Sequence, residues 1–206
     1  MADTKERILC AALRRFAAEG YEAVSVSDIA GDLGITKGAL YQHYRSKRDI
    51  FDSILARMAA RDAEQAQAHD LPEGTPEETA EAYRTATVDQ IVAFSKAMFR
   101  YWTMDDFAAR FRRMLTLEQY RDAEMTRLYQ QYLAAGPLGY VADLFAALGF
   151  DRPRERAAGF YGPMFLMYSV YDGAEDQEAV LSETDALLDG MGERLNKELE
   201  EVRERP

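Results

Sequence analysis

Hydrophobic residues recur at three- and four-residue spacing along nearly the whole chain, and no segment alternates apolar and polar residues as a half-buried strand does. A first amphipathic helix ends at Gly20, two short helices follow on either side of Gly34, and a long helix opens at Ser46. Asp, Ser or Thr begins each of these segments, and a glycine ends the first two, as helix caps require. The pattern predicts an all-α protein.

The rest of the chain continues the helical pattern after a loop over residues 69–76, where prolines and glycine gather. Helices are expected over residues 76–103, 104–114, 117–134, 138–148, 154–171 and 176–203. The sequence therefore predicts a small N-terminal domain of three helices over residues 1–48 and a larger helical domain over residues 49–206, with about nine helices.

Composition agrees with a folded protein, because 48% of the 206 residues are hydrophobic and 30% are charged. Cys10 is the only cysteine, and His43 and His69 are the only histidines, so we expect no internal disulfide, metal cluster or cofactor. The N-terminus does not resemble a signal peptide, and the longest uncharged run, from Ala157 to Tyr171, contains glycines and a proline. We expect a cytoplasmic protein that does not enter membranes.

The net charge of −11 is unevenly distributed along the chain. Residues 1–50 hold eight basic and seven acidic side chains, which leaves −12 for the remainder. The segment from Thr36 to Arg48 contains four basic residues and no acid. Because phosphate binding needs local positive charge, this segment is the one candidate face for nucleic acid.

The two short helices and the turn Gly34-Ile35-Thr36 between them have the spacing of a helix-turn-helix, in which the second helix enters the major groove. Helical hairpins with a glycine are common and most of them bind nothing, so spacing alone does not decide. The residue string from Gly34 to Ile50, GITKGALYQHYRSKRDI, resembles the signature of the TetR family of bacterial repressors, and the resemblance extends over about residues 5–55. Tyr44 and Ile50 stand where the family usually has phenylalanine and leucine.

The resemblance implies DNA contacts for residues at the start of the second helix, along the third, and at the start of the fourth. Lys37 and Gln42 carry the longest hydrogen-bonding side chains of the reading helix, so they are candidates for guanine and adenine edges. For His43 an ordinary surface role, and for Tyr44 a core role, remain open. The predicted DNA-binding set is Ser25, Ser27, Thr36, Lys37, Gly38, Ala39, Tyr41, Gln42, His43 and Lys47.

The last helix places Leu181, Leu188, Leu195 and Val202 seven residues apart, which indicates a seam for another helix. The resemblance implies that this helix and the one before it pair with a second copy in a four-helix bundle. The alternative is packing within one chain. The predicted homodimer interface is Met167, Tyr171, Leu181, Leu188, Met191 and Leu195.

Aromatic residues and methionines are frequent in the part of the sequence between the predicted DNA-binding domain and the last helix. Each one alone fits plain core packing, but the resemblance implies that together they surround a cavity for a small apolar or aromatic effector. The predicted ligand-binding set is Phe94, Met98, Trp102, Phe107, Phe111, Tyr129, Phe160, Met164 and Tyr168.

These features predict a ligand-responsive, sequence-specific transcriptional regulator that binds a palindromic operator in double-stranded DNA as a homodimer and is released by its effector. Repression is the family norm, and activation stays open. One rival is an enzyme, for which the chain offers no nucleophile motif, glycine-rich phosphate loop or metal-ligand spacing. The other is a dimeric DNA-binding adaptor without a small-molecule effector.

Overall fold

A computed structural model describes residues 4–68 and 85–203 of the chain. Within these ranges the regular secondary structure is entirely helical, which confirms the all-α class. None of the helices in these ranges has the length and apolar character needed to cross a membrane. The described residues divide into two compact units: one holds those through Gln65 together with Asp105–Tyr129, and the other holds the described residues between 66 and 104 and those from Gln130 onward.

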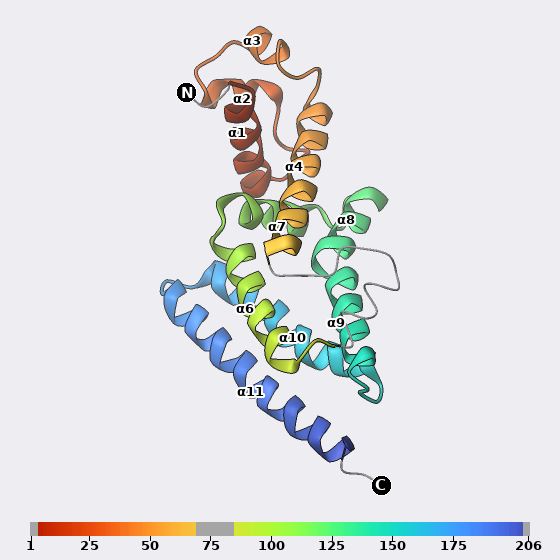
Figure 1. The fold of residues 1–206 in the computed structure, drawn as a ribbon. Coiled ribbons are helices and arrows are strands. Elements are labelled where there is room, and N and C mark those ends of the chain that lie inside the picture. The colour runs from red at the N-terminus through yellow and green to blue at the C-terminus, as the bar shows by residue number, and fades with distance from the viewer. Residues whose placement is uncertain (1–3, 69–84, 204–206) are drawn as a thin grey trace. The chain divides into compact units, whose positions relative to one another are not determined.

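The first unit is built around α1 (Thr4–Glu19), which packs against α2 (Val26–Asp32) and α7 (Asp106–Glu118). The short α3 (Lys37–Tyr41) follows α2, and α4 (Lys47–Ala68) leads away from it (Figure 1). The apolar faces of these helices meet in a core that excludes water completely at several side chains, among them Ile8, Phe16, Ile29, Leu40 and Phe51. Burial of this shared face supplies most of the stability that such short helices lack on their own.

Caps predicted from the sequence set the boundaries of α2 and α3. Ser25 and Asp28 form a reciprocal capping box at the start of α2, and the Thr36 hydroxyl accepts a hydrogen bond from the Ala39 N–H at the start of α3. Gly34, in the turn between them, has φ +63°, a conformation that suits a residue without Cβ. One boundary differs from the prediction: α3 ends at Tyr41 instead of Tyr44, and residues 42 and 43 form a turn.

The second unit contains α6 (Val88–Met104), α9 (Ala135–Ala147), α10 (Pro153–Gly173) and α11 (Gln177–Arg203). The helix α8 (Ala123–Leu133) begins in the first unit and ends in the second. Within this unit α10 packs most extensively against α9, and α11 packs against both α6 and α10 (Figure 1). The approach of α11 to α6 is close at Gly192, where a Cβ would lie 2.7 Å from a methyl of Val92.

The helix predicted over residues 76–103 is interrupted. Residues 76–84 and the predicted loop with His69 lie outside the described residues, but residues 86 and 87 are non-helical and α6 begins only at Val88. Thr87 and Gln90 form a capping box there, with the Thr87 N–H donating to Gln90 Oε1 at 2.8 Å and the Gln90 N–H to Thr87 Oγ1 at 3.2 Å. This Thr-x-x-Gln pattern is a helix start that the periodicity of apolar residues did not reveal.

Two later boundaries also differ from the prediction. The expected helix from residue 117 begins at Ala123 because Asp122 Oδ1 accepts from the backbone N–H groups of Glu124 and Met125 and so caps α8. The expected break at Gly136-Pro137 lies earlier, at Ala134, which is the N-cap of α9. Pro137 is then accommodated in the first turn of α9, where a missing N–H costs no helical hydrogen bond.

Candidate nucleic-acid interface

The third helix of the first unit has one buried and one exposed side. Leu40 and Tyr44 face the core, with 0% and 2% of their surface exposed. In Figure 1, α3 lies at the end of this unit opposite α7. Of the predicted DNA-binding set, the structure leaves these residues exposed: Ser25, Ser27, Thr36, Lys37, Gly38, Tyr41, Gln42 and His43; Ala39 and Lys47 are half-buried.

Tyr44 belongs to the core, which settles the alternative left open by the sequence. Its hydroxyl donates to the backbone carbonyl of Lys5 at 3.2 Å, so the phenol finds a partner at a position where the family usually has phenylalanine. Burial raises the pKa of Tyr44 to about 12, which keeps the side chain neutral across the physiological range.

Two of the hydroxyls predicted to contact phosphates are already engaged as helix caps. Ser25 Oγ accepts from the Asp28 N–H at 3.2 Å. The Ser25 hydroxyl and backbone N–H donate to Asp28 Oδ2 at 2.6 and 2.8 Å, and these two donors lower the pKa of Asp28. Thr36 Oγ1 accepts from the Ala39 N–H at 3.1 Å. The caps hold α2 and α3 in place, and they leave Ser27 and Tyr41 as the exposed hydroxyls of this group without a capping role.

The four basic side chains predicted as a phosphate-binding face divide into two pairs. Arg48 donates to both carboxylate oxygens of Glu124 at 2.6 and 2.7 Å and to Asp52 at 2.7 Å, so its charge is neutralised. Lys47 donates to the carbonyl oxygen of Tyr21 at 2.8 Å. Lys37 lies 5.8 Å from the ring of Tyr41, and Arg45 is exposed. The positive charge most available to a ligand therefore belongs to Lys37 and Arg45.

The turn after α1 is held by a set of contacts that the sequence did not indicate. The Tyr21 ring packs against Phe16 and Phe51 at centroid distances of 5.1 and 5.0 Å, and the Lys47 ammonium lies 4.3 Å from its centroid. The Tyr21 N–H donates to Glu118 Oε1 at 2.9 Å. Glu118 is only 1% exposed, so a buried carboxylate at the end of α7 fixes the turn that leads into α2.

The predicted ligand-binding set is distributed over both units. Phe107, Phe111 and Tyr129 are buried in the first unit, whereas the remaining members belong to the second. Tyr168 stacks on Phe99 at 5.0 Å and Trp102 makes an edge contact with Tyr132 at 6.5 Å, so aromatic packing accounts for their burial. The residues of the set in the second unit are Phe94, Met98, Trp102, Phe160, Met164 and Tyr168. Their role toward a ligand stays a prediction.

The predicted dimer seam is mostly buried within the chain itself. Leu188 is 0% exposed, and Tyr171, Leu181 and Met191 are also buried in the second unit, where α11 packs against α6 and α10. Met167 and Leu195 are half-buried. The buried members are therefore covered by their own chain, and the role of the whole set in a homodimer stays a prediction.

A different face of α10 presents apolar surface. Phe165, Leu166 and Val170 are 36%, 62% and 41% exposed, and they lie in the uncharged run from Ala157 to Tyr171. The spacing of Leu166 and Val170, four residues apart on a helix, was the available indication of this face.

Across the described residues, no group of His, Cys, Asp and Glu side chains is arranged to hold a metal ion.

Comparison with known proteins places these features in a family. Residues 8–54 match the family model of the bacterial regulatory proteins of the tetR family. Over 52 residues the chain is 40% identical to the HTH-type transcriptional regulator AcrR of Shigella flexneri, which covers 25% of this chain and 24% of that protein. Over 56 residues it is 43% identical to the HTH-type transcriptional repressor BepR of Brucella suis, which covers 27% of each.

The chain thus matches about a quarter of the length of these curated relatives. Solved structures extend the likeness of the fold. A TetR-family transcriptional regulator from Bordetella parapertussis superposes with a TM-score of 0.61 over 91% of this chain and 95% of that one, at 19% identity. The fatty acid degradation regulator FadR of Bacillus halodurans superposes with a TM-score of 0.59 over 91% and 96%, at 17% identity. Over residues 8–54, the chain thus has the N-terminal domain of the bacterial regulatory proteins of the tetR family.

Proposed function

We propose that this protein is a sequence-specific DNA-binding transcriptional regulator that reads the major groove with α3. The observation that carries the proposal is the capped helix-turn-helix, whose second helix buries Leu40 and exposes Lys37, with Gln42 exposed directly after it. The relatives that match this segment are named as transcriptional regulators, and none of the functions in their names is enzymatic.

Lys37 and Gly38 on α3, and Gln42 directly after it, each have a chemical role in this proposal. Lys37 donates to guanine acceptors and Gln42 forms a paired contact with adenine. Gly38 keeps the helix surface low, since the nearest atom to a Cβ built there is Thr36 Oγ1 at 3.8 Å and the outer side is open. Arg45 and the residues flanking α3 contact the phosphate backbone and set the register of the helix on the duplex.

The regulator acts as a homodimer on a palindromic operator in this proposal. The exposed Phe165, Leu166 and Val170 on α10 support it, because a second copy would cover this apolar face. Two copies related by a twofold axis present their α3 helices about 34 Å apart, the distance between successive major grooves. The relative BepR is named a repressor, so repression is the proposed direction.

Release of the operator by a small apolar effector completes the proposal. Trp102 is the only tryptophan and is buried among aromatic rings of the second unit, so its fluorescence reports ligand binding there. The second candidate, an adaptor that dimerises without an effector, gains support from the aromatic packing that already fills the surroundings of Tyr168. Lipophilic compounds that change Trp102 fluorescence and weaken operator binding together favour the effector. Fluorescence changes that leave DNA binding constant favour the adaptor.

Salt-dependent binding to a random-sequence duplex tests the DNA interface without knowledge of the operator. Arg45→Ala removes an exposed charge beside α3, and the matched control Arg154→Ala removes an exposed charge from the first turn of α10. The slope of log K against log salt should fall by about one for each phosphate contact that Arg45→Ala removes, and should be unchanged in the control. Equal slopes for the two variants would exclude the proposed face.

A further inference from the structure

The turn that joins α1 to α2 is held from two sides at one residue. It runs over residues 20–25, and Tyr21 lies near its start. The Tyr21 N–H donates to Glu118 Oε1 at 2.9 Å, and the Tyr21 carbonyl oxygen accepts from Lys47 Nζ at 2.8 Å. Glu118 is the last residue of α7 and Lys47 is the first residue of α4, so two helices distant in sequence hold the donor and the acceptor of one backbone position.

The ammonium group of Lys47 is committed to this turn. Besides the Tyr21 carbonyl, it donates to the carbonyl oxygen of Glu22 at 3.3 Å, and it lies 4.3 Å from the centroid of the Tyr21 ring. An ammonium has three N–H donors, so the backbone takes two of them and the ring adds a cation–π attraction. The side chain is half-buried. A phosphate would have to displace these partners or use the one donor that is left.

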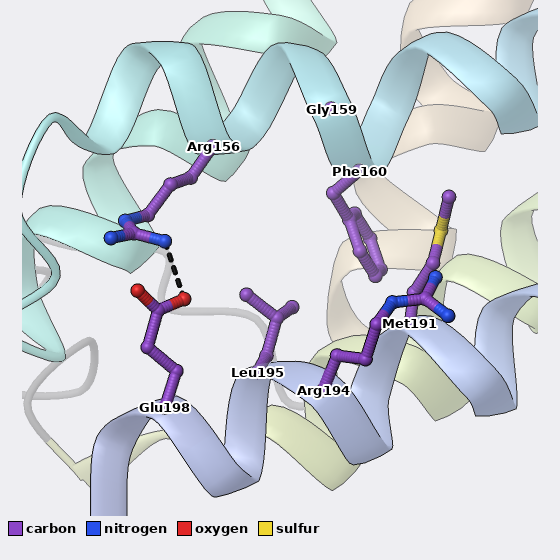
Figure 2. Close-up of a pocket in the computed structure, with 7 residues that line it drawn as sticks. All are labelled: Arg156, Gly159, Phe160, Met191, Arg194, Leu195 and Glu198. Carbon is purple, nitrogen blue, oxygen red and sulfur yellow. Dashed lines mark hydrogen bonds and ion pairs between the residues drawn. The ribbon is translucent and has the colours of Figure 1, made fainter. Parts of the chain in front are cut away.

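The partners of Lys47 differ in kind from those of two other cationic side chains. Arg156 pairs with Glu198 (Figure 2), and Lys96 pairs with Asp189 at 2.6 Å, so a carboxylate neutralises each of these charges. Lys47 donates to neutral carbonyl oxygens instead. Its hydrogen bonds therefore fix the path of the backbone without cancelling its charge.

The contacts of Lys47 join the two ends of the helix-turn-helix. Tyr21 and Glu22 lie in the segment that enters α2, and Lys47 begins the helix that follows α3. Between these points α2 has seven residues and α3 has five, too few to hold an orientation by their own hydrogen bonds. A hydrogen bond that closes this segment at its base restricts the orientations that α3 can take. Lys47 is therefore placed to determine how α3 meets a duplex.

Glu118 connects this closure to α7. Its carboxylate is buried, with Oε1 accepting from the Tyr21 N–H and Oε2 accepting from Arg121 Nε at 3.3 Å. Since a buried backbone N–H without an acceptor is costly, the turn keeps its position against α7 as long as the Glu118 contact is made. The Lys47 and Glu118 contacts thus share one element, the backbone of Tyr21.

We propose that Lys47 is a positioning residue for DNA reading, which orients α3 by joining the Tyr21 turn to the start of α4, and that Glu118 secures this junction from α7. Lys47 then acts on DNA binding through the orientation of α3 and is not one of the phosphate contacts, in contrast to its place in the predicted DNA-binding set. The inference rests on the proposed DNA-binding function and gives one of its residues a different role.

Two duplexes separate a positioning role from a phosphate contact: the duplex that the wild type selects from a random pool, and a random-sequence duplex. Lys47→Met keeps the aliphatic stem and removes the donors. It should weaken binding to the selected duplex about tenfold, the order of one charge-assisted hydrogen bond, and binding to the random duplex much less. A lost phosphate contact would weaken both alike and lower the slope of log K against log salt by about one. The slope for Lys47→Met should stay close to that of the wild type, and the control Arg45→Ala should lower it.

Variants of Glu118 test the junction from the other side. Glu118→Ala removes the acceptor of the Tyr21 N–H and should reduce affinity for the selected duplex, whereas Glu118→Gln keeps an acceptor oxygen and should retain most of it. The double variant Lys47→Met with Glu118→Ala should lose less than the product of the two single effects, because both act on the same turn. Thermal unfolding followed by circular dichroism verifies that each variant is folded at the assay temperature. If Glu118→Ala is unfolded there, Lys47→Met still decides between the two roles.

Three results would count against the inference. If Lys47→Met lowers the salt slope as Arg45→Ala does and weakens both duplexes alike, the positioning role is wrong and the DNA-binding function stands. Independent effects of Lys47→Met and Glu118→Ala would overturn the role of Glu118 in the junction. If the wild type selects no duplex, the proposed function fails, and this inference fails with it.

Discussion

Replacement of Gly20 by alanine should destabilise the first unit far more than the same change at Gly34. Both glycines have positive φ, +84° and +63°, so a Cβ is strained at either position. They differ in their surroundings: at Gly20 a Cβ would lie 2.5 Å from Glu118 Oε1, whereas at Gly34 it would have no atom within 4 Å. The two substitutions therefore separate backbone strain from the contact with α7.

The magnitude follows from the two contributions. A residue with a Cβ in the left-handed region costs about 1–2 kcal/mol, which applies to both variants. At Gly20 the carboxylate of Glu118 must also move, and since it is buried, the Tyr21 N–H loses its acceptor, at about 1–3 kcal/mol. We expect a loss in the free energy of unfolding of about 2–5 kcal/mol for Gly20→Ala and about 1–2 kcal/mol for Gly34→Ala.

Urea unfolding followed by circular dichroism measures both free energies. The double variant Gly20→Ala with Glu118→Ala should cost less than the sum of the single variants, because the clash and the lost hydrogen bond involve the same carboxylate. Equal destabilisation by Gly20→Ala and Gly34→Ala, together with additive behaviour of the double variant, would refute the role given to Glu118.

Three further predictions concern charge and assembly. Arg15 holds the pKa of Asp32 at about 2, below its ordinary value, so Asp32→Asn should lower the melting temperature at pH 7, and the difference from wild type should vanish as the pH falls from about 4 toward 2. Burial raises the pKa of Asp62 to about 6, so ionisation opposes folding increasingly as the pH rises from about 4 and fully above about 6, and Asp62→Asn should raise the melting temperature at pH 8 but not at pH 4. Leu166→Asp should dissociate the homodimer in sedimentation without loss of helicity, whereas Leu188→Asp should unfold the second unit, and a dimeric Leu166→Asp variant would place the interface elsewhere.

Local chemistry made the helix-turn-helix predictable from the sequence. The Ser25 capping box, the Thr36 cap and the positive φ of Gly34 depend on residues within a few positions of one another, and all three are found in the structure. The same holds for Leu40, whose burial follows from the apolar spacing of neighbouring helices.

Features that depend on partners distant in sequence were not predictable. Glu118 reaches Tyr21 across 97 residues, and Arg48 reaches Glu124 across 76, so neither the fixed turn nor the neutralised arginine can be read from spacing. The seven-residue repeat in α11 identified a packed face correctly, but a repeat does not state whether the partner helix belongs to the same chain. Only the tertiary structure shows that Leu188 is covered by its own chain.

Selection of bound sequences from a pool of random duplex DNA tests the central claim most directly, performed in parallel on the wild type and on Gln42→Ala. The account predicts that the wild type recovers a palindrome whose half-site centres lie one helical turn apart, and that Gln42→Ala recovers the same spacing with a relaxed preference at one base pair of each half-site. Recovery of no common sequence by the wild type, or identical preferences for both proteins, would contradict a reading role for α3.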